Sequence, residues 1–351
     1  MQVMINFNAA ILESSHSPLV VDEISFRGPL AAGQVLLRIF YSGVCGAQIN
    51  EIDAVKGPDR FLPHLLGHEG IGEVIEVGPS VSTVAQGDMV VMHWMVGDGL
   101  QSDPPKFEWR GREVNAGWIT TFSEYTVASE NRVTRVSTDM LHKYLPLFGC
   151  AALTAWGSLV NDGHMRLGDS VVVLGAGGVG LLTVEAARAG GAHPIVVVDR
   201  FSDRAEAAQR FGAESVFVSD RPDLEDGIRQ VLGSRGCDLV IETTGAKSMI
   251  ELAYRMAAHG GRAVLVGVPQ RDNPASLNTL DLHFGMTLTG SKGGSVNPSI
   301  DIPRLVDLAE RDIYRVTSIP VSEFCLGDIN EGIDGIRNGQ TGRIVINMMD
   351  S

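Results

Sequence analysis

The segment Gly175-Ala-Gly177-Gly178-Val179-Gly180 lies between an apolar run at 170–174 and a helical stretch at 179–189. In a strand–turn–helix unit, the first glycine allows the tight turn and the second lets the backbone approach a pyrophosphate. The third lets the helix pack closely on the strand. Backbone amides at the helix N-terminus then face the phosphates, and the helix dipole favours their negative charge. The segment therefore predicts a dinucleotide-binding turn.

A carboxylate stands where such a turn needs one. Asp199 ends the next apolar run, 194–199, and follows Gly180 by 199 − 180 = 19 residues. A carboxylate at this position accepts hydrogen bonds from the adenosine ribose and repels a 2′-phosphate, so NAD is favoured over NADP. Arg200 follows directly and could soften that preference.

The pattern around the turn indicates two domains. Further short apolar runs, at 215–218, 238–242 and 263–267, alternate with helical stretches, which is typical of a doubly wound parallel sheet of the Rossmann type. The chain before residue 147 instead shows β-strand alternation broken by Gly and Pro, and it predicts a mostly β domain. The tail contains two helical segments and the strand-like Arg343-Ile-Val-Ile. We expect a discontinuous β domain at 1–150 and 291–351, and a Rossmann domain at 151–290.

Composition excludes several classes of protein. The 351 residues carry 28 basic and 42 acidic side chains, a net charge of −14, without a basic block, which argues against a nucleic-acid partner. A hydrophobic content of 44% argues against a disordered chain. No run approaches the ~18 apolar residues of a membrane span, and the N-terminus has no basic signal region. We expect a cytoplasmic protein without a membrane partner.

The four cysteines, Cys45, Cys150, Cys237 and Cys325, lie far apart without a CxxC pair. This spacing suits a reducing compartment, where the thiols are either inert or ligands. Together with His68, two thiolates would form a three-ligand zinc set that leaves a fourth position open, as a catalytic zinc requires. Spacing alone cannot assemble residues so far apart.

The order of the motifs adds a resemblance. Gly43-Val-Cys45-Gly46, Gly67-His68-Glu69 and the glycine turn follow one another within residues 36–343. The chain resembles the zinc-dependent branch of the medium-chain dehydrogenase/reductase superfamily, the alcohol and polyol dehydrogenases. The resemblance implies a GroES-like β domain and a homodimer or homotetramer. Such oligomers often extend the nucleotide-domain sheet through its edge strand, here residues 286–290.

The resemblance also implies roles for single residues. It makes Cys45, His68 and Cys150 the ligands of a catalytic zinc, and Glu69 the acid that in some members approaches the metal. It implies further cofactor contacts: Thr154 and Val179 beside the nicotinamide, Arg204 at the adenosine end, and Arg343 near the pyrophosphate.

Two departures from the family pattern matter. Residues 93–118 lack the four cysteines of the family's structural zinc lobe, so we predict one zinc per chain. This segment is expected to be a loop that covers the active-site mouth, joins a subunit contact, or is simply solvated.

The second departure concerns the proton relay. After the first ligand the family usually has a hydroxyl residue, an Asp and a His, where this chain has Ala47, Gln48 and Asn50. Ala47 cannot relay a proton, and Gln48 is expected to accept the ring proton of His68. Protons would leave through water or through a substitute: Glu51, His93 or Glu69.

The expected activity is reversible oxidation of an alcohol to a carbonyl, with zinc as Lewis acid and NAD as hydride acceptor. His93 and Trp94 align near a pocket wall, which slightly favours a secondary hydroxyl of a polyol, sugar or cyclitol. A satisfied wall histidine is equally consistent with the sequence. Two alternatives stay open: a C=C or iminium reductase of the same superfamily, and a catalytically silent NAD-binding protein.

Overall fold

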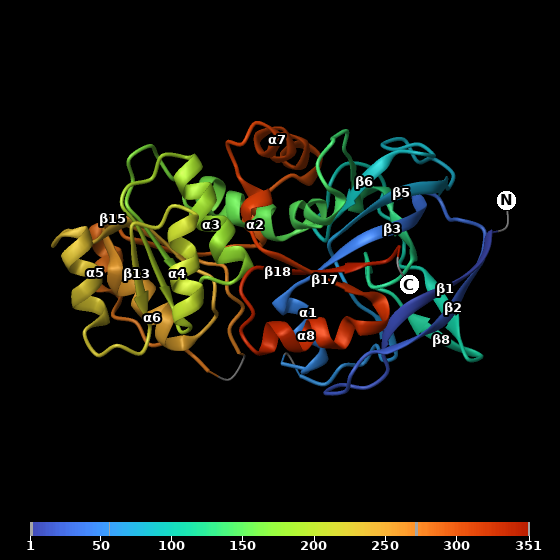
Figure 1. The fold of residues 1–351 in the computed structure, drawn as a ribbon, viewed down its shortest axis with the longest axis horizontal. Helices are drawn as coiled ribbons and strands as arrows, with labels where there is room; N and C mark the ends of the chain where they lie inside the picture. Colours follow the sequence, from blue (N-terminus) through green and yellow to red (C-terminus); the bar gives the residue numbers. More distant parts are fainter. Residues whose placement is uncertain (1–2, 56, 271–272, 350–351) are drawn as a thin grey trace. The chain divides into compact units, whose positions relative to one another are not determined.

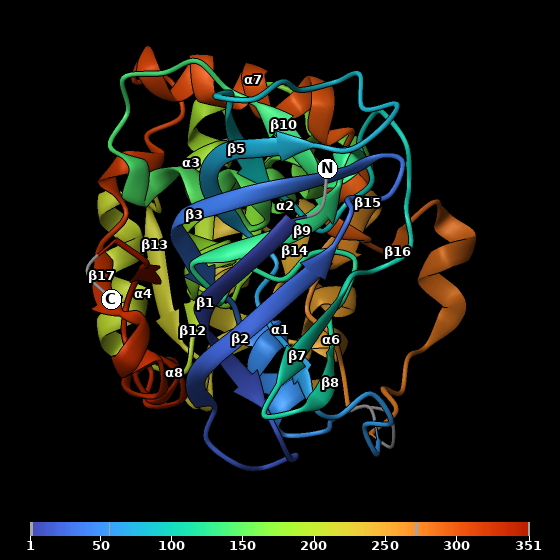
Figure 2. The ribbon, with the colours of Figure 1, turned by 90° about the vertical axis from the view of Figure 1, so that its right-hand side faces the viewer.

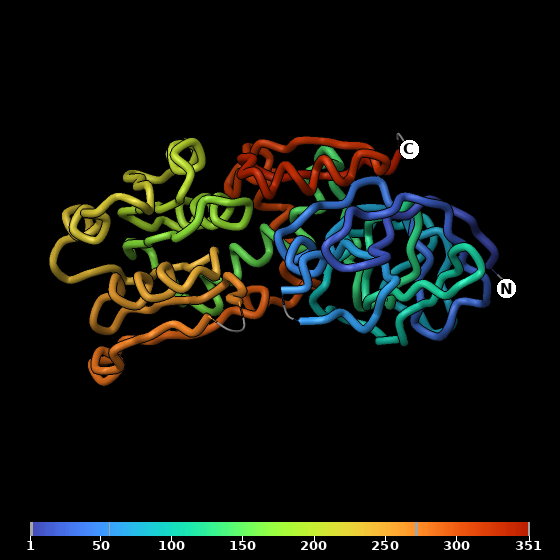
Figure 3. Tube along the Cα trace, turned by 90° about the horizontal axis from the view of Figure 1, so that it is seen from below, coloured from blue at the N-terminus to red at the C-terminus, as the bar shows by residue number. Residues whose placement is uncertain are grey.

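The computed structural model describes residues 3–55, 57–270 and 273–349. The chain forms two compact units. Unit 1 comprises Met1–Cys150, Asn297–Arg311 and Pro320–Ser351, and unit 2 comprises Ala151–Val296 and Asp312–Ile319. The chain leaves unit 1 after Cys150, and its C-terminal segment returns to that unit, as the trace in Figure 3 shows.

Unit 2 contains a six-stranded parallel sheet in the order β13-β12-β11-β14-β15-β16, and it confirms the predicted Rossmann-like half (Figure 1). Its strands are β11 (Val171–Leu174), β12 (Ile195–Asp199), β13 (Ser215–Val218), β14 (Cys237–Glu242), β15 (Ala257–Leu265) and β16 (Thr287–Gly290). Its α-helices are α2 (Ala151–Gly157), α3 (Gly178–Ala189), α4 (Ser202–Arg210), α5 (Leu224–Leu232) and α6 (Lys247–Met256). Short helical turns complete it: η3 (Ser158–Asp162), η4 (Thr279–Phe284), η5 (Gly293–Ser295) and η6 (Val316–Ser318).

The central strands of this sheet are apolar because helices cover both faces. All residues of β11 and β12 are buried. Strand β15 begins at Ala257, six residues before the predicted run at 263. Its early part, Ala257-Ala-His-Gly-Gly, has no apolar pattern, and pairing with β14 across a register shift makes it a strand.

Unit 1 contains a closed barrel in the order β1-β2-β7-β8-β4. Figure 2 labels four of these strands, β1, β2, β7 and β8. Its strands are β1 (Val3–Leu12), β2 (Val20–Gly28), β4 (His64–Leu65), β7 (Lys106–Trp109) and β8 (Arg112–Asn115). A second sheet has the order β10-β6-β5-β3-β18-β17, with β9 also paired to β3. Its members are β3 (Gln34–Val44), β5 (Gly70–Val77), β6 (Met89–Met92), β9 (Tyr125–Ser129), β10 (Val133–Arg135), β17 (Val321–Cys325) and β18 (Arg343–Asn347). The predicted β-rich half is confirmed.

The helices of unit 1 are few. They are α1 (Gly46–Ile52), α7 (Pro298–Glu310) and α8 (Ile329–Arg337), with the shorter η1 (Glu130–Arg132), η2 (His142–Gly149) and η7 (Leu326–Asp328). Helix α7 begins five residues before the predicted start at 303. Asn297 caps it by accepting a hydrogen bond from Ser299 N–H, and Pro298 suits the first turn.

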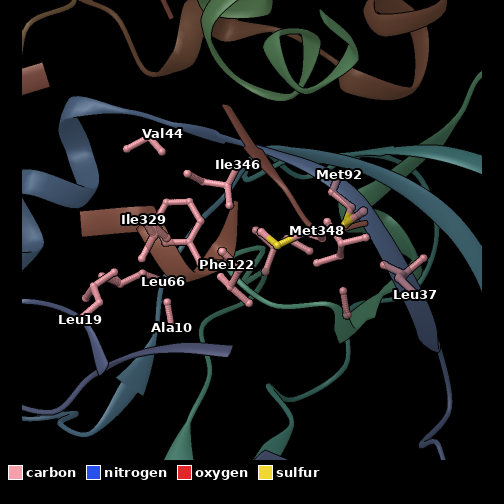
Figure 4. Close-up of a cluster of buried hydrophobic side chains, with 14 of the residues drawn as sticks. Ala10, Leu19, Leu37, Val44, Leu66, Met92, Phe122, Ile329, Ile346 and Met348 are labelled. Carbon is pink, nitrogen blue, oxygen red and sulfur yellow. The ribbon is translucent and has the colours of Figure 1, made fainter. Parts of the chain in front are cut away.

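The core of unit 1 explains why the tail returns. Side chains from both ends of the chain meet in one cluster, with Ala10 and Leu37 packed together with Ile329, Ile346 and Met348 (Figure 4). Burying each large aliphatic side chain contributes about 1.5–3 kcal/mol. Strand β18 also pairs with the end of β3, which directly precedes Cys45. The last strand of the chain therefore helps to position Cys45.

Part of the segment 93–118 is not the expected loop. Residues 106–115 form the hairpin β7–β8 inside the barrel, and Phe107, Trp109 and Val114 are buried in its core. The loop prediction is wrong for these residues. Their side chains alternate between the barrel core and the outside, but each strand has only four residues, which is too few for the alternation to be recognised in the sequence.

A buried carboxylate holds two loops of unit 1 in place. Glu130 is fully buried and accepts hydrogen bonds from the N–H groups of Ser82 (2.8 Å), Thr83 (2.9 Å) and Leu100 (2.9 Å). Burial acts to raise the pKa of Glu130, but these donors outweigh it and hold the pKa below its usual value of 4.5. The ionised carboxylate is therefore the form that stabilises the fold.

Replacing Glu130 by glutamine is expected to lower the free energy of unfolding by about 1–3 kcal/mol near neutral pH, since buried donors lose an anionic acceptor. The folded pKa lies below the unfolded one, so this stabilisation is complete above pH 4.5 and is lost as the pH falls through the folded value. Urea denaturation of both proteins between about pH 7 and about pH 4 measures the difference. A difference that does not shrink on acidification would contradict this account.

The division into units differs from the predicted boundaries at two places. Residues 291–296 and the segment Asp312–Ile319 belong to unit 2. Arg315 forms an ion pair with the fully buried Glu185 of α3, 3.0 Å away, and the Tyr314 hydroxyl donates to the backbone oxygen of Leu182. These long-range contacts hold the segment on unit 2, and the local sequence pattern does not predict them.

Among the described residues, no helix combines the length and the apolar character that crossing a membrane would need.

Candidate functional site

Three potential metal ligands converge in unit 1. Cys45 follows β3 and caps α1, His68 lies between β4 and β5, and Cys150 follows η2. Their ligand atoms lie within 4.8 Å of one another, and in the described part of the chain they are the one group of three or more such residues. Zinc bonds to nitrogen and sulfur are about 2.0–2.3 Å long, so the ligand atoms of one zinc ion must lie close to one another, as these three do.

A second observation supports a zinc ion at these three residues. Nε2 of His68 is a buried ring nitrogen for which the described residues offer no hydrogen-bond partner. Buried polar atoms are normally satisfied, so this nitrogen points to a missing ligand. Two thiols and one imidazole are a common catalytic zinc set.

Cys45 and Cys150 shift each other's pKa in opposite directions. The hydrogen bond from Cys150 lowers the pKa of Cys45 well below its usual value, although burial opposes ionisation. The same bond, together with burial, raises the pKa of Cys150. Cys45 is therefore the sulfur that ionises first.

Glu69 follows His68 in the sequence, and its charge raises the pKa of both His68 and Cys150. It is fully buried and forms an ion pair with Arg343, which is 6% exposed. Gly43 makes room for it, because a Cβ there would lie 2.2 Å from Glu69 Oε1. Arg343 thus lies in unit 1 beside Glu69 and the thiols, whose charges raise its pKa although burial opposes it.

Gln48 contacts two of the three potential ligands, Cys45 and His68. It is buried on α1, and the Cys45 N–H donates to its Oε1 at 2.9 Å. Its amide nitrogen, rather than its oxygen, faces Nδ1 of His68. The expectation that Gln48 accepts the ring proton is therefore not met in this arrangement. Asn50 lies half-buried one position before Glu51 on the same helix.

His93 is a satisfied buried residue. It is fully buried, its Nδ1–H donates to Met95 O (2.8 Å), and its Nε2 accepts from the Thr134 hydroxyl (2.9 Å). Burial lowers the pKa of His93 to about 4, so the ring is neutral at physiological pH. Trp94 is half-buried and packs against the core of unit 1. Both ring nitrogens of His93 therefore already have hydrogen-bond partners within the protein.

The glycine turn in unit 2 has the geometry expected of it. It joins β11 to α3, with Gly175 at a φ of +101°. A Cβ on Gly180 would lie 1.8 Å from the oxygen of Gly175, so only glycine fits without a backbone shift. Gly177 and Gly178 open α3, Val179 is half-buried on its first turn, and Thr154 is buried on α2.

Asp199 is tied to this turn. It ends β12, and its carboxylate accepts hydrogen bonds from the N–H groups of Ala176 (2.6 Å) and Phe201 (2.9 Å). Arg200 and Arg204 both lie over the Phe201 ring, with guanidinium carbons 4.6 and 5.1 Å from its centroid. Burial lowers the pKa of Arg204.

Two residues at the end of β14 were not predicted, and one of them, Thr243, bonds to the glycine turn. The Thr243 hydroxyl donates to the oxygens of Leu174 (3.0 Å) and Gly175 (3.2 Å). Glu242 is fully buried at the end of β14 and accepts from the Thr244 N–H (2.6 Å). Burial raises the pKa of Glu242. An acid that ends a buried strand, the signal that identified Asp199, would have pointed to Glu242.

Comparison with known proteins gives a consistent result. Residues 31–138 match the alcohol dehydrogenase GroES-like domain, and residues 178–311 match the zinc-binding dehydrogenase family. An S-(hydroxymethyl)glutathione dehydrogenase of Escherichia coli O1:K1 is 29% identical over 367 residues, covering 96% of this chain and 98% of the relative.

Two solved structures are similar over nearly their whole length. An alcohol dehydrogenase zinc-binding domain protein from Burkholderia ambifaria has a TM-score of 0.90 at 26% identity, with 99% of this chain and 100% of that chain covered. Benzyl alcohol dehydrogenase from Acinetobacter calcoaceticus has a TM-score of 0.89 at 26% identity, with 98% and 99% covered.

Fold and site together define a metal-assisted oxidoreductase with a dinucleotide-binding half. The chain belongs to the zinc-binding alcohol dehydrogenase family of medium-chain dehydrogenases/reductases, and it is a zinc-dependent alcohol dehydrogenase.

Proposed function

We propose that this dehydrogenase holds one zinc ion at Cys45, His68 and Cys150, uses NAD(H) bound at the glycine turn, and interconverts an alcohol and a carbonyl compound. The observation that carries the proposal is the convergence of two thiols on a buried imidazole nitrogen that has no other partner among the described residues. When bound, the metal supplies a Lewis acid for the substrate oxygen, and the nicotinamide takes the hydride.

The chain's own residues prepare this chemistry. Cys45, His68 and Cys150 would hold a zinc ion with three protein ligands, a number that leaves room for a substrate oxygen. Arg343 places a positive charge beside Glu69 and the thiols, which offsets part of the negative charge gathered at the ligands.

Burial reduces the number of residues that could carry the substrate proton to solvent. His93 is fully buried with both ring nitrogens bonded, and Glu69 is fully buried beside Arg343. Glu51 is exposed on α1, one turn after Gln48. We therefore assign the transfer of the substrate proton to solvent to Glu51, with water between it and the site.

Replacing Asp199 by alanine is expected to lower kcat/KM for NAD by about 10–100-fold, since hydrogen bonds to a charged group contribute about 1.5–3 kcal/mol. The ratio of NADP to NAD use should rise, because no carboxylate remains to repel a 2′-phosphate. Steady-state kinetics with both cofactors measures this. The matched control is Asp203→Ala, which removes an exposed acid on α4. An equal change of preference in both variants would contradict a specific role for Asp199.

Two substrate classes follow from different observations. The sequence slightly favours a secondary hydroxyl of a polyol, sugar or cyclitol, and the burial of His93 removes one polar side chain on which that expectation rested. The similarity to benzyl alcohol dehydrogenase favours an aromatic primary alcohol. A panel of sorbitol, inositol, benzyl alcohol and S-(hydroxymethyl)glutathione, followed by NADH absorbance, separates them. Failure of the zinc-loaded protein to form NADH with any of a broad alcohol panel would overturn the proposed activity.

We also propose that the protein is a homodimer or homotetramer joined through unit 2. Strand β16 lies at the edge of the parallel sheet, and the neighbouring η4 exposes Leu280, Leu282 and Phe284. A strand edge beside exposed apolar side chains suits pairing with a second copy. Light scattering gives the number of subunits.

A further inference from the structure

The Gln48 amide joins the Cys45 N–H to Nδ1 of His68. The side chain is 1% exposed, so its amide depends on protein partners. On one side lies the Cys45 N–H, 2.9 Å from Oε1, and on the other side lies Nδ1 of His68.

The Cys45 N–H decides which way the amide points. A backbone N–H can only donate, so an acceptor must face it, and the Gln48 amide has its single acceptor at Oε1. The amide –NH₂ group is then left facing Nδ1 of His68, where it donates. Nδ1 must therefore offer a lone pair, and the proton of the neutral ring lies on Nε2.

Metal binding requires the opposite arrangement. Nε2 is the ring nitrogen that lacks a hydrogen-bond partner among the described residues, and the site's donor set needs its lone pair. With the lone pair on Nε2, the proton lies on Nδ1 and meets the amide –NH₂, so two donors face each other. Turning the amide over relieves that contact but places its –NH₂ against the Cys45 N–H.

We propose that Gln48 is a positioning residue that weakens zinc binding, because its amide favours the ring form of His68 that cannot ligate the metal. This inference rests on the proposed zinc site. Zinc can bind only when the Gln48 side chain moves away from the arrangement that satisfies Cys45. A carboxylate at this position would accept from both donors at once and carry no such cost.

The test is the substitution Gln48→Glu, which keeps the length and shape of the side chain and replaces the –NH₂ group by an oxygen. Zinc affinity of the full chain, measured by competition with a chromophoric chelator, is expected to rise about 10–100-fold, the range typical of residues that hydrogen-bond a metal ligand. An affinity equal to that of the natural chain, or lower, would overturn the inference.

A matched control is available in the same unit. Gln34 is also a buried glutamine whose Oε1 accepts from a backbone N–H, that of Ala31 at 2.9 Å. Its Nε2 donates to Asp103 O, not to a potential ligand. Gln34→Glu adds the same charge to a comparable buried position, and zinc affinity should stay within about twofold of the natural chain. A similar rise in both variants would show a general charge effect and contradict the inference.

A second measurement does not depend on any Gln48 variant folding. In the zinc-free natural chain, at a pH high enough for the His68 ring to be neutral, ¹⁵N shifts of labelled histidine rings should show its single proton on Nε2, with the signal assigned by its loss in His68→Asn. Zinc should move the proton to Nδ1. Protonation of Nδ1 in the zinc-free chain would overturn the inference. The proposed function fails separately, through absence of zinc binding in every variant or absence of NADH formation by the zinc-loaded chain.

Discussion

Replacing Cys45 by serine is expected to abolish alcohol oxidation while NADH binding survives. Serine stays protonated at neutral pH and is a poor zinc ligand, and His68 and Cys150 alone leave the metal with two protein ligands. Losing a Lewis acid that contributes several kcal/mol should lower kcat at least about 10³-fold. Elemental analysis should find the zinc content falling from one per chain towards zero. NADH fluorescence titration should give an unchanged dissociation constant, because the glycine turn belongs to unit 2.

The matched control is Cys325→Ser. Cys325 is a half-buried thiol at the end of β17 whose Sγ–H donates to Asp328, a bond that a serine hydroxyl can replace. Activity and zinc content should remain those of the natural chain. Full turnover by a zinc-free Cys45→Ser protein would refute the metal-assisted mechanism. Equal losses in both variants would mean that the change acts on folding.

Replacing Arg343 by methionine should lower the free energy of unfolding by about 3–5 kcal/mol. The change removes the positive charge that pairs with the fully buried carboxylate of Glu69, close to the two thiols. Methionine fills a similar volume, so loss of packing contributes little. Urea denaturation of the zinc-loaded chain measures the effect.

The double variant Glu69→Gln with Arg343→Met separates charge from packing. It removes both charges, so part of the lost stability should return. The family resemblance suggested instead that Arg343 lies near the cofactor pyrophosphate. Unchanged stability in Arg343→Met together with weaker NADH binding would support that role and contradict the one argued here.

The nucleotide-binding half was largely readable from the sequence because its signals are local. Strands buried on both faces give continuous apolar runs, as at β11 and β12, and Gly175 to Gly180 with Asp199 lie within one strand–helix–strand unit. The structure differs from the expected bounds where contacts between distant segments override the local pattern. Strand β15 begins in a glycine-rich stretch, and Asp312–Ile319 packs on unit 2 through Glu185.

Unit 1 was less readable because its strands are short and its pairs are distant. The hairpin β7–β8 lies in a segment that looked like a loop, and its burial depends on closure of the barrel with β2 and β4. His93 illustrates the limit for single residues. Its sequence context suits a pocket wall, and only the positions of Met95 and Thr134 show that both ring nitrogens are already bonded.

By itself, the sequence determined the two halves of this dehydrogenase and the glycine turn, since each depends on residue type and local order. The three candidate zinc ligands came from the resemblance of the ordered motifs to a known family. Only the tertiary structure decided that Cys45, His68 and Cys150 meet, that Arg343 lies beside Glu69, and that the Gln48 amide faces Nδ1 of His68. The physical reason is that these relations join residues brought together by strand pairing and core packing, notably β18 on β3. Such contacts between distant segments leave no local pattern in the chain.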